Sequence, residues 1–268
     1  MTSEARLPAE RVQLTLDLVY AFDRPAHHLD IELRVRPLLA AGTGLAAIRL
    51  ASEPEGRFDP PEIDRNGVIV DRLKLAGPTP RLRLNASFDH LVGTDAALPA
   101  LAPTAADLVL DGLVDTAASM PWPQALADLR RSWRYSDDPR DQPQTLQEIA
   151  QRRTGSCEAI ARLAVEIIRA QSVPVRFVGG YRLVDLHNHT RPVRRHAWIA
   201  IWEGEQWRMH DPLAPSATGQ CLIPTASASR LPEIATIQGS FRGAGTARLT
   251  VSAHAQRHGS SVGHGRSP

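Results

Sequence analysis

The sequence predicts an α+β fold in two parts, an N-terminal antiparallel β domain followed by a region of mixed helices and strands. Two observations support this prediction. Before residue 92, apolar and polar residues alternate, which is typical of half-buried strands. After an Ala/Pro-rich stretch at 95–106, apolar residues recur at spacings of three and four, which indicates helices. A chain of 268 residues is long enough to bury a sizeable core.

The first part reads as a series of strands separated by turns. Val12, Leu14, Leu16 and Leu18 alternate with polar residues, which predicts a strand over 11–22. Further strand-like runs lie at 30–36, 45–51, 68–75 and 81–88. Turn signals separate them at Pro60-Pro61, Asn66-Gly67 and Gly77-Pro78. We therefore expect an antiparallel β-sandwich-like domain over 1–94 and a linker over 95–106.

The second part, expected to form one domain over 107–254, begins with helices and ends with strands. Helical spacing of apolar residues predicts helices at 107–118, 123–133, 144–152 and 157–171. Strand-like runs follow at 175–184, 196–202, 206–211 and 246–253. The tail 255–268 is rich in Gly, Ser and His, and we expect it to be disordered.

Composition excludes several classes of protein. The net charge of +2 is too balanced to indicate a nucleic-acid or membrane partner. No run of about 18 apolar residues predicts a membrane helix, and no leader pattern precedes residue 11. Two cysteines, Cys157 and Cys221, are too few for a disulfide scaffold. We expect a cytoplasmic protein.

A histidine pair at residues 187 and 189 suggests a metal site only weakly. Asp185 is near these two imidazoles, but no further cluster completes a tetrahedral ligand set. We expect a polar loop here, and neither a metal nor an organic cofactor.

Cys157 is the first candidate catalytic residue. It opens the clearest predicted helix, and Thr154 or Ser156 can cap that helix. Unpaired N–H groups and the helix dipole at a helix N-terminus stabilise a thiolate, and the same N–H groups can receive an oxyanion. The alternative interpretation is a small buried cysteine on a helix face.

His196 and Asp211 are the second and third candidates, because a predicted hairpin joins them. If Glu203-Gly204 forms the turn, His196 lies directly opposite Asp211, with Cβ atoms roughly 4.5–5.5 Å apart. The carboxylate would accept the hydrogen on Nδ1 and leave Nε2 for the thiol. His210 would point to the opposite face of the strand.

The order of these residues follows a known pattern. A Gly-x-Cys opens a long helix, an Arg-Ala-x-x-Val-Pro-x-Arg-x-Val-x-Gly-Tyr segment follows at 169–181, and His-Ala-Trp and Asp-Pro complete it. In this respect residues 144–213 resemble the transglutaminase-like superfamily. Residues 12–88 more weakly resemble the β domain that precedes this core in many bacterial relatives. The resemblance implies a papain-like core after the β domain.

The resemblance implies Cys157 as nucleophile, His196 as general base and acid, and Asp211 as the residue that orients His196. The expected reaction is acyl transfer through a thioester, most simply hydrolysis of a peptide-like amide. Two alternatives stay open. An amine acceptor, or a carrier-bound acyl group, would make the protein a transglutaminase or an amide-forming acyltransferase. A non-catalytic scaffold would keep only the fold.

Substrate contacts and the second oxyanion donor are less well defined by the sequence. We expect substrate-binding residues at Gln151, Arg194, Arg195 and Trp198. The arginines next to His196 most simply form a solvated turn, and the alternative is that they recognise a carboxylate. Trp198 is likewise more simply a core residue than a substrate contact. The candidates for the second oxyanion donor are Gln147, Gln151 and Trp133.

Overall fold

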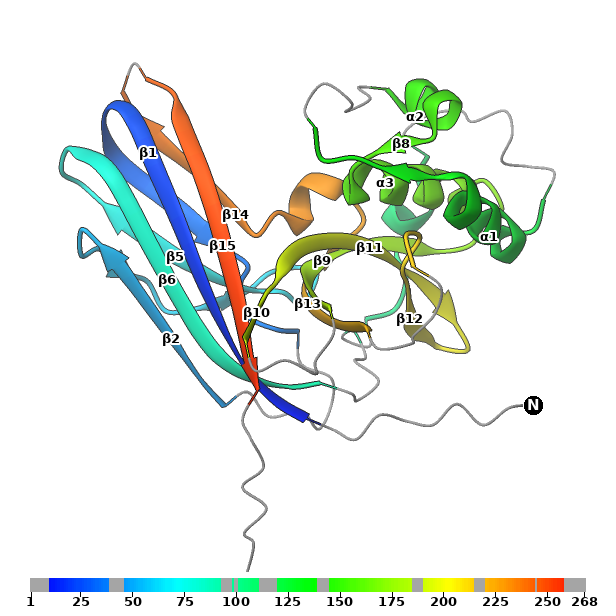
Figure 1. The fold of residues 1–268 in the computed structure, drawn as a ribbon, viewed down its shortest axis with the longest axis horizontal. Helices are drawn as coiled ribbons and strands as arrows, with labels where there is room; N and C mark the ends of the chain where they lie inside the picture. The colour runs from blue at the N-terminus through cyan, green and yellow to red at the C-terminus, as the bar shows by residue number, and fades with distance from the viewer. Residues whose placement is uncertain are drawn as a thin grey trace, which may run out of the picture.

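The structure, a computed structural model, has two parts that lie side by side, a β sandwich and a smaller core of helices and strands (Figure 1). The residues that it describes are 10–38, 46–92, 98, 101–110, 120–138, 145–184, 190–214, 220–243 and 245–257. The predicted α+β class is confirmed. The histidine pair at 187 and 189 and the tail beyond residue 257 lie outside the described residues.

One long strand runs through both layers of the sandwich. β1 (Glu10–Leu33) pairs over its first half with β6 and β15, and over its second half with β5 and β14. Its register with β6 shifts between Ala21 and Ala26, where the strand crosses from one layer to the other. The other strands of this part that precede residue 95 are β2 (Ala46–Glu53), β3 (Arg57–Phe58), β4 (Glu62–Ile63), β5 (Ile69–Leu75) and β6 (Thr79–Val92).

The alternation that predicts these strands is an alternation of burial. In the first half of β1 the even-numbered apolar side chains from Val12 to Leu18 are buried, whereas Thr15 is exposed. Alternating residues of β6, from Leu82 to Phe88, join the same apolar cluster. Burial of one face of each layer holds the two sheets together.

The last two strands differ from the expected domain boundary. β14 (Ile237–Arg242) and β15 (Ala247–Arg257) both pair with β1, so they belong to the sandwich and not to the second domain. β15 also extends into the segment from 255 that is expected to be disordered, as far as its end at Arg257. Alternation in a sequence identifies a strand but not the sheet that it joins.

The core packs helices against a four-stranded antiparallel sheet of order β12-β11-β9-β13. Its helices are α1 (Trp122–Ser132), α2 (Leu146–Arg152) and α3 (Cys157–Arg169), and α3 lies against β11 and β9. The sheet contains β9 (Val175–Val184), β11 (Arg194–Glu203), β12 (Gln206–His210) and β13 (Gln220–Ala228). In the described part of the chain, no helix is long and apolar enough to cross a membrane.

The helix expected over 107–118 is a single short turn in its described part. η1 (Ala105–Leu108) ends at Val109, which has an extended backbone, and residues 111–119 lie outside the described ranges. The first turn of the expected helix is instead held by a buried ion pair, in which Arg176 donates to both carboxylate oxygens of Asp107 at 2.8 and 3.0 Å. Ser229 donates to the same carboxylate at 2.7 Å.

The other arginine of the Arg-Ala-x-x-Val-Pro-x-Arg segment is also structural. Arg169, at the end of α3, donates to backbone carbonyl groups of Asp107, Val109, Val175 and Ser229. The glycine of the same segment allows two strands to approach. A Cβ on Gly180 would lie 2.0 Å from the carbonyl oxygen of Ile223 and 2.9 Å from the Trp198 ring.

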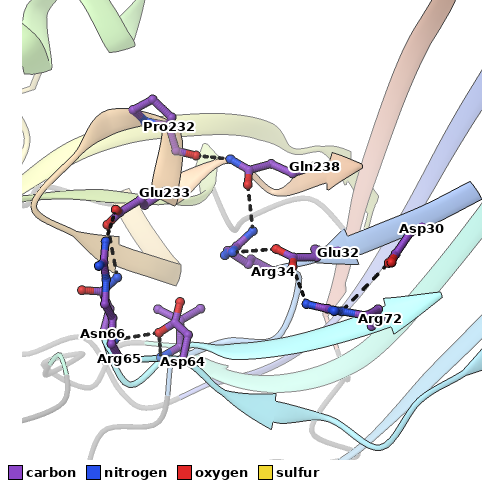
Figure 2. A network of polar contacts seen from close by, with 11 residues as sticks. Asp30, Glu32, Arg34, Asp64, Arg65, Asn66, Arg72, Pro232, Glu233 and Gln238 are labelled. Carbon is purple, nitrogen blue, oxygen red and sulfur yellow. Dashed lines mark hydrogen bonds and ion pairs between the residues drawn. The ribbon is translucent and has the colours of Figure 1, made fainter. Parts of the chain in front are cut away.

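Apolar and polar contacts join the two parts of the molecule. Tyr181, Leu183 and Ile223 of the core sheet belong to the apolar cluster of the sandwich. Figure 2 shows the polar side of this junction, where Arg65 and Asn66 of a sandwich turn hydrogen-bond Glu233 of η3 (Leu231–Ile234). Exposed pairs of this kind contribute little stability, so we infer that the apolar contacts hold the junction together.

Candidate active site

Cys157 is the first residue of α3 and is partly exposed. The Ser156 side chain caps this helix by accepting a hydrogen bond from the Ala159 N–H at 3.4 Å. The two-residue strand β8 (Thr154–Gly155) lies just before α3 in the chain. It pairs in parallel with β7 (Arg134–Tyr135). The candidate nucleophile therefore lies at a helix N-terminus whose backbone is held by these contacts, and unpaired N–H groups there favour negative charge.

His196 and Asp211 form a buried pair beside α3. The distance between His196 Nε2 and Asp211 Oδ2 is 2.9 Å, and only 6% and 8% of the two side chains are exposed. Cys157 lies close enough to the same imidazole to raise the pKa of His196. The structure thus brings the three predicted side chains together from α3, β11 and the end of β12.

The expected register of the hairpin is wrong, although the contact forms. Glu203 pairs with Gln206 and Ile199 with His210, so the turn is Gly204-Glu205 and not Glu203-Gly204. Asp211 therefore follows the last paired residue by one and is diagonal to His196 instead of opposite. A shift of two residues keeps both side chains on one face, and diagonal neighbours lie within reach of long side chains.

The expected assignment of the ring nitrogens is also wrong. Asp211 contacts Nε2 and not Nδ1. This leaves Nδ1 of His196 for the thiol, because an imidazole has only two ring nitrogens. The chemistry is unchanged, since either nitrogen can carry the transferred proton while the other is held by the carboxylate.

The protonated form of His196 is favoured in this site. Burial lowers the pKa of His196, but hydrogen bonds and charge from Asp211 and Cys157 outweigh burial and raise this pKa to about 9. At neutral pH this favours a positive charge on the ring, beside the thiol of Cys157.

Further contacts, which local sequence patterns do not predict, fix the carboxylate and the loop that carries it. Asp211 Oδ1 accepts a hydrogen bond from the Leu213 N–H at 2.9 Å, and Arg130 Nε donates to the Asp211 carbonyl at 3.1 Å. Arg182 Nη1 lies 3.9 Å from Oδ2. Gly180 pairs with His196, and Arg182 follows Gly180 by two residues on the same strand. This spacing points to Arg182 only once the strand pairing is known, and the sequence alone does not give that pairing.

The four expected substrate-binding residues have different surroundings. Trp198 is fully buried and stacks on His196, with ring centroids 5.8 Å apart, so it belongs to the core and that expectation is wrong. Gln151 is exposed on α2. Arg195 forms an ion pair with Glu158, and Arg194 lies 3.8 Å from Asp137.

The three candidates for a second oxyanion donor also have different surroundings. The Trp133 indole N–H donates to the Gly155 carbonyl at 3.3 Å, so it is already used. Gln147 and Gln151 are exposed on α2, and neither has a hydrogen bond to Cys157 among the contacts of the described residues.

Among the residues that the structure describes, no group of three or more His, Cys, Asp or Glu side chains could hold a metal ion. His210 lies outside the site, since it hydrogen-bonds Glu203 at 2.7 Å and packs edge-on against Trp122.

Comparison with known proteins agrees with this architecture. A protein of Cytophaga hutchinsonii that is provisionally described as a cysteine protease has a similar crystal structure, with a TM-score of 0.68, 14% identity, and coverage of 94% of this chain and 99% of that one. At this identity the likeness shows the fold alone. The periplasmic domain of TgpA from Pseudomonas aeruginosa matches with 15% identity over 74% of this chain and 87% of its own, but its TM-score of 0.36 carries no argument.

Sequence comparisons give two further likenesses. The uncharacterised protein ML0607 of Mycobacterium leprae (strain TN) is 28% identical over 100 residues, which is 36% of this chain and 36% of that protein. The chain thus matches about a third of this curated relative. The sequence model of the transglutaminase-like superfamily matches residues 122–212, a segment that includes Cys157, His196 and Asp211. Residues 122–212 of the chain therefore match the transglutaminase-like superfamily.

Proposed function

We propose that this protein is a cysteine-dependent acyl-transfer enzyme in which Cys157, His196 and Asp211 form a catalytic triad. The observation that carries the proposal is the buried His196–Asp211 contact of 2.9 Å beside a cysteine at a helix N-terminus. A scaffold protein would have no need to bury a histidine and a carboxylate together next to a partly exposed thiol.

In the first half of the reaction the Cys157 thiolate attacks the carbonyl carbon of an amide. The carbonyl π electrons move to oxygen, and backbone N–H groups at the start of α3 stabilise the oxyanion. His196 gives its proton to the leaving nitrogen, the C–N bond breaks, and an amine leaves. The products are a thioester at Cys157 and a neutral His196 held by Asp211.

In the second half an acceptor attacks the thioester. We propose water as the acceptor: His196 takes a proton from water, the C–S bond breaks, and a carboxylic acid and the Cys157 thiolate result. An amine acceptor would go through the same step and leave a new amide instead. The proposed substrate class is a peptide-like amide. The cytoplasmic location expected from the sequence stays a prediction.

Turnover of p-nitrophenyl acetate, a simple acyl donor, tests the proposal. We expect the wild type to release p-nitrophenolate catalytically and Cys157→Ala to release none above background. Analysis of the acetyl product with and without methylamine distinguishes the acceptors, since acetate indicates hydrolysis and N-methylacetamide indicates aminolysis. A wild type that never acylates would contradict the proposal and favour a scaffold. The matched control is Cys221→Ser, which leaves the proposed nucleophile in place.

A further inference from the structure

A tetrahedral intermediate on Cys157 needs hydrogen-bond donors for its oxygen, and the side-chain donor is unassigned. The start of α3 supplies backbone N–H groups. The Trp133 indole N–H is used by the Gly155 carbonyl, and the two glutamines of α2 are exposed on that helix. The side chain of Tyr135 is a further candidate.

Tyr135 is held close to the nucleophile by the strand pair β7–β8. It pairs with Gly155, two residues before Cys157. The Ser136 N–H donates to the Gly155 carbonyl at 3.0 Å, and the Thr154 hydroxyl donates to the Arg134 carbonyl at 3.0 Å. These contacts fix the backbone on both sides of Tyr135, while its side chain stays 45% exposed.

The neighbours of the Tyr135 hydroxyl group suit a hydrogen-bond donor. Burial raises the pKa of Tyr135, and the charges of Cys157 and Asp137 raise it further against the opposing effect of Arg194, so the phenol keeps its proton at neutral pH. Arg194 lies close enough to the phenol to lower the pKa of Tyr135, and it lies 3.8 Å from Asp137. A guanidinium group can only donate, so toward Arg194 the phenol oxygen can only accept, and its own O–H group can donate elsewhere.

We propose that the Tyr135 hydroxyl is a second oxyanion donor, which hydrogen-bonds the oxygen of the acyl group while Cys157 is bonded to its carbon. The inference rests on the proposed acyl transfer and adds a catalytic residue to it. The hydroxyl donates a hydrogen bond and keeps its proton throughout, so no bond to Tyr135 forms or breaks. Arg194, on β11, is a positioning residue that orients and polarises the phenol.

The test compares two reactions of Cys157 in the wild type and in Tyr135→Phe. Acylation by p-nitrophenyl acetate passes through an oxyanion, whereas alkylation by iodoacetamide is a direct displacement without one. We expect Tyr135→Phe to slow acylation about 10²-fold and to leave alkylation of Cys157 unchanged. Tyr20→Phe, which removes a partly buried hydroxyl in the sandwich, is the matched control and should change neither rate.

Three results would overturn the inference. Acylation of Tyr135→Phe at the wild-type rate would show that the hydroxyl is not a donor. An equal fall of acylation and alkylation would show that Tyr135 acts on the thiol and not on the oxyanion. A wild type that is alkylated but never acylated would instead refute acyl transfer itself, and the inference with it.

The role of Arg194 is tested by combining substitutions. If Arg194 acts only through the phenol, Arg194→Gln should slow acylation less than Tyr135→Phe does, and the double variant should be no slower than Tyr135→Phe. Losses that multiply would overturn the positioning role and indicate direct contact between Arg194 and substrate.

Discussion

Replacing Asp211 with Asn tests how the carboxylate acts on His196. One oxygen of Asp211 accepts the Leu213 N–H and the other faces His196 Nε2, each at 2.9 Å. Asn offers one acceptor oxygen and a donor NH₂ group. If the oxygen stays with Leu213, the NH₂ group faces Nε2, which must then give up its hydrogen. The remaining ring hydrogen sits on Nδ1, and the ring can no longer take a proton from the thiol.

The size of the effect follows from the pKa of His196. The net rise from 6.5 to about 9 corresponds to about 3 kcal/mol in favour of the protonated ring; Asp211 and Cys157 supply this net effect and also offset burial. Losing the larger share, that of Asp211, should lower this pKa by at least about one pH unit. Because protonated His196 accompanies the active thiolate, activity should fall as pH rises through this pKa. The alkaline limb therefore moves from about pH 9 to about pH 8 or below, and kcat/KM at neutral pH falls by about 10²- to 10⁴-fold.

The assay is kcat/KM for p-nitrophenyl acetate from about pH 6 to about pH 10. Asp17→Asn, which removes a carboxylate on the sandwich surface, is the control and should leave the profile unchanged. Full activity of Asp211→Asn would mean that another group orients His196. A loss of rate without movement of the alkaline limb would refute the argument that Asp211 sets the protonation of the ring.

Three further predictions concern packing and the thiol. Arg176→Met leaves the Asp107 carboxylate buried without its bidentate partner and should lower the free energy of unfolding in urea by about 3–5 kcal/mol; a loss under about 1 kcal/mol would contradict this. Gly180→Ala places a methyl group 2.0 Å from a carbonyl oxygen and should cost about 3 kcal/mol or more, whereas Gly77→Ala, with no atom within 4 Å, should lie within about 0.5 kcal/mol of the wild type in the same urea titration. Iodoacetamide should label Cys157 faster than the other cysteine at about neutral pH, as peptide mapping can measure, and equal slow labelling would count against a thiolate at this helix start.

The hairpin shows what sequence patterns could and could not predict. Strand parity correctly put His196 and Asp211 on one face, because the period of two survives a register error of two residues. The turn itself was misplaced. A two-residue hairpin turn often has Gly second, but here Gly204 is first and Glu205 takes the second position with φ of 66°. Nothing local in the sequence predicts a left-handed Glu.

Contacts between residues far apart in the chain are the second feature that the sequence does not predict. The helix start at Cys157 and the strands of the core sheet follow from local spacing, which the sequence contains. That β15 joins β1 in the sandwich, and that Arg182 approaches Asp211, depends on strand pairing across the chain. Tyr135 was missed for the same reason, since β7 meets β8 through a parallel pair of only two residues on each side.

The most direct test of the central claim is to trap the thioester and locate it. Wild-type protein is mixed briefly with p-nitrophenyl acetate, quenched in acid, and examined by intact mass and peptide mapping. We predict one acetyl group on the peptide that contains Cys157, no acetyl group in Cys157→Ala, and a much slower appearance of the adduct in His196→Ala. Acetylation elsewhere on the chain, or adduct formation at the wild-type rate without His196, would contradict the proposed triad.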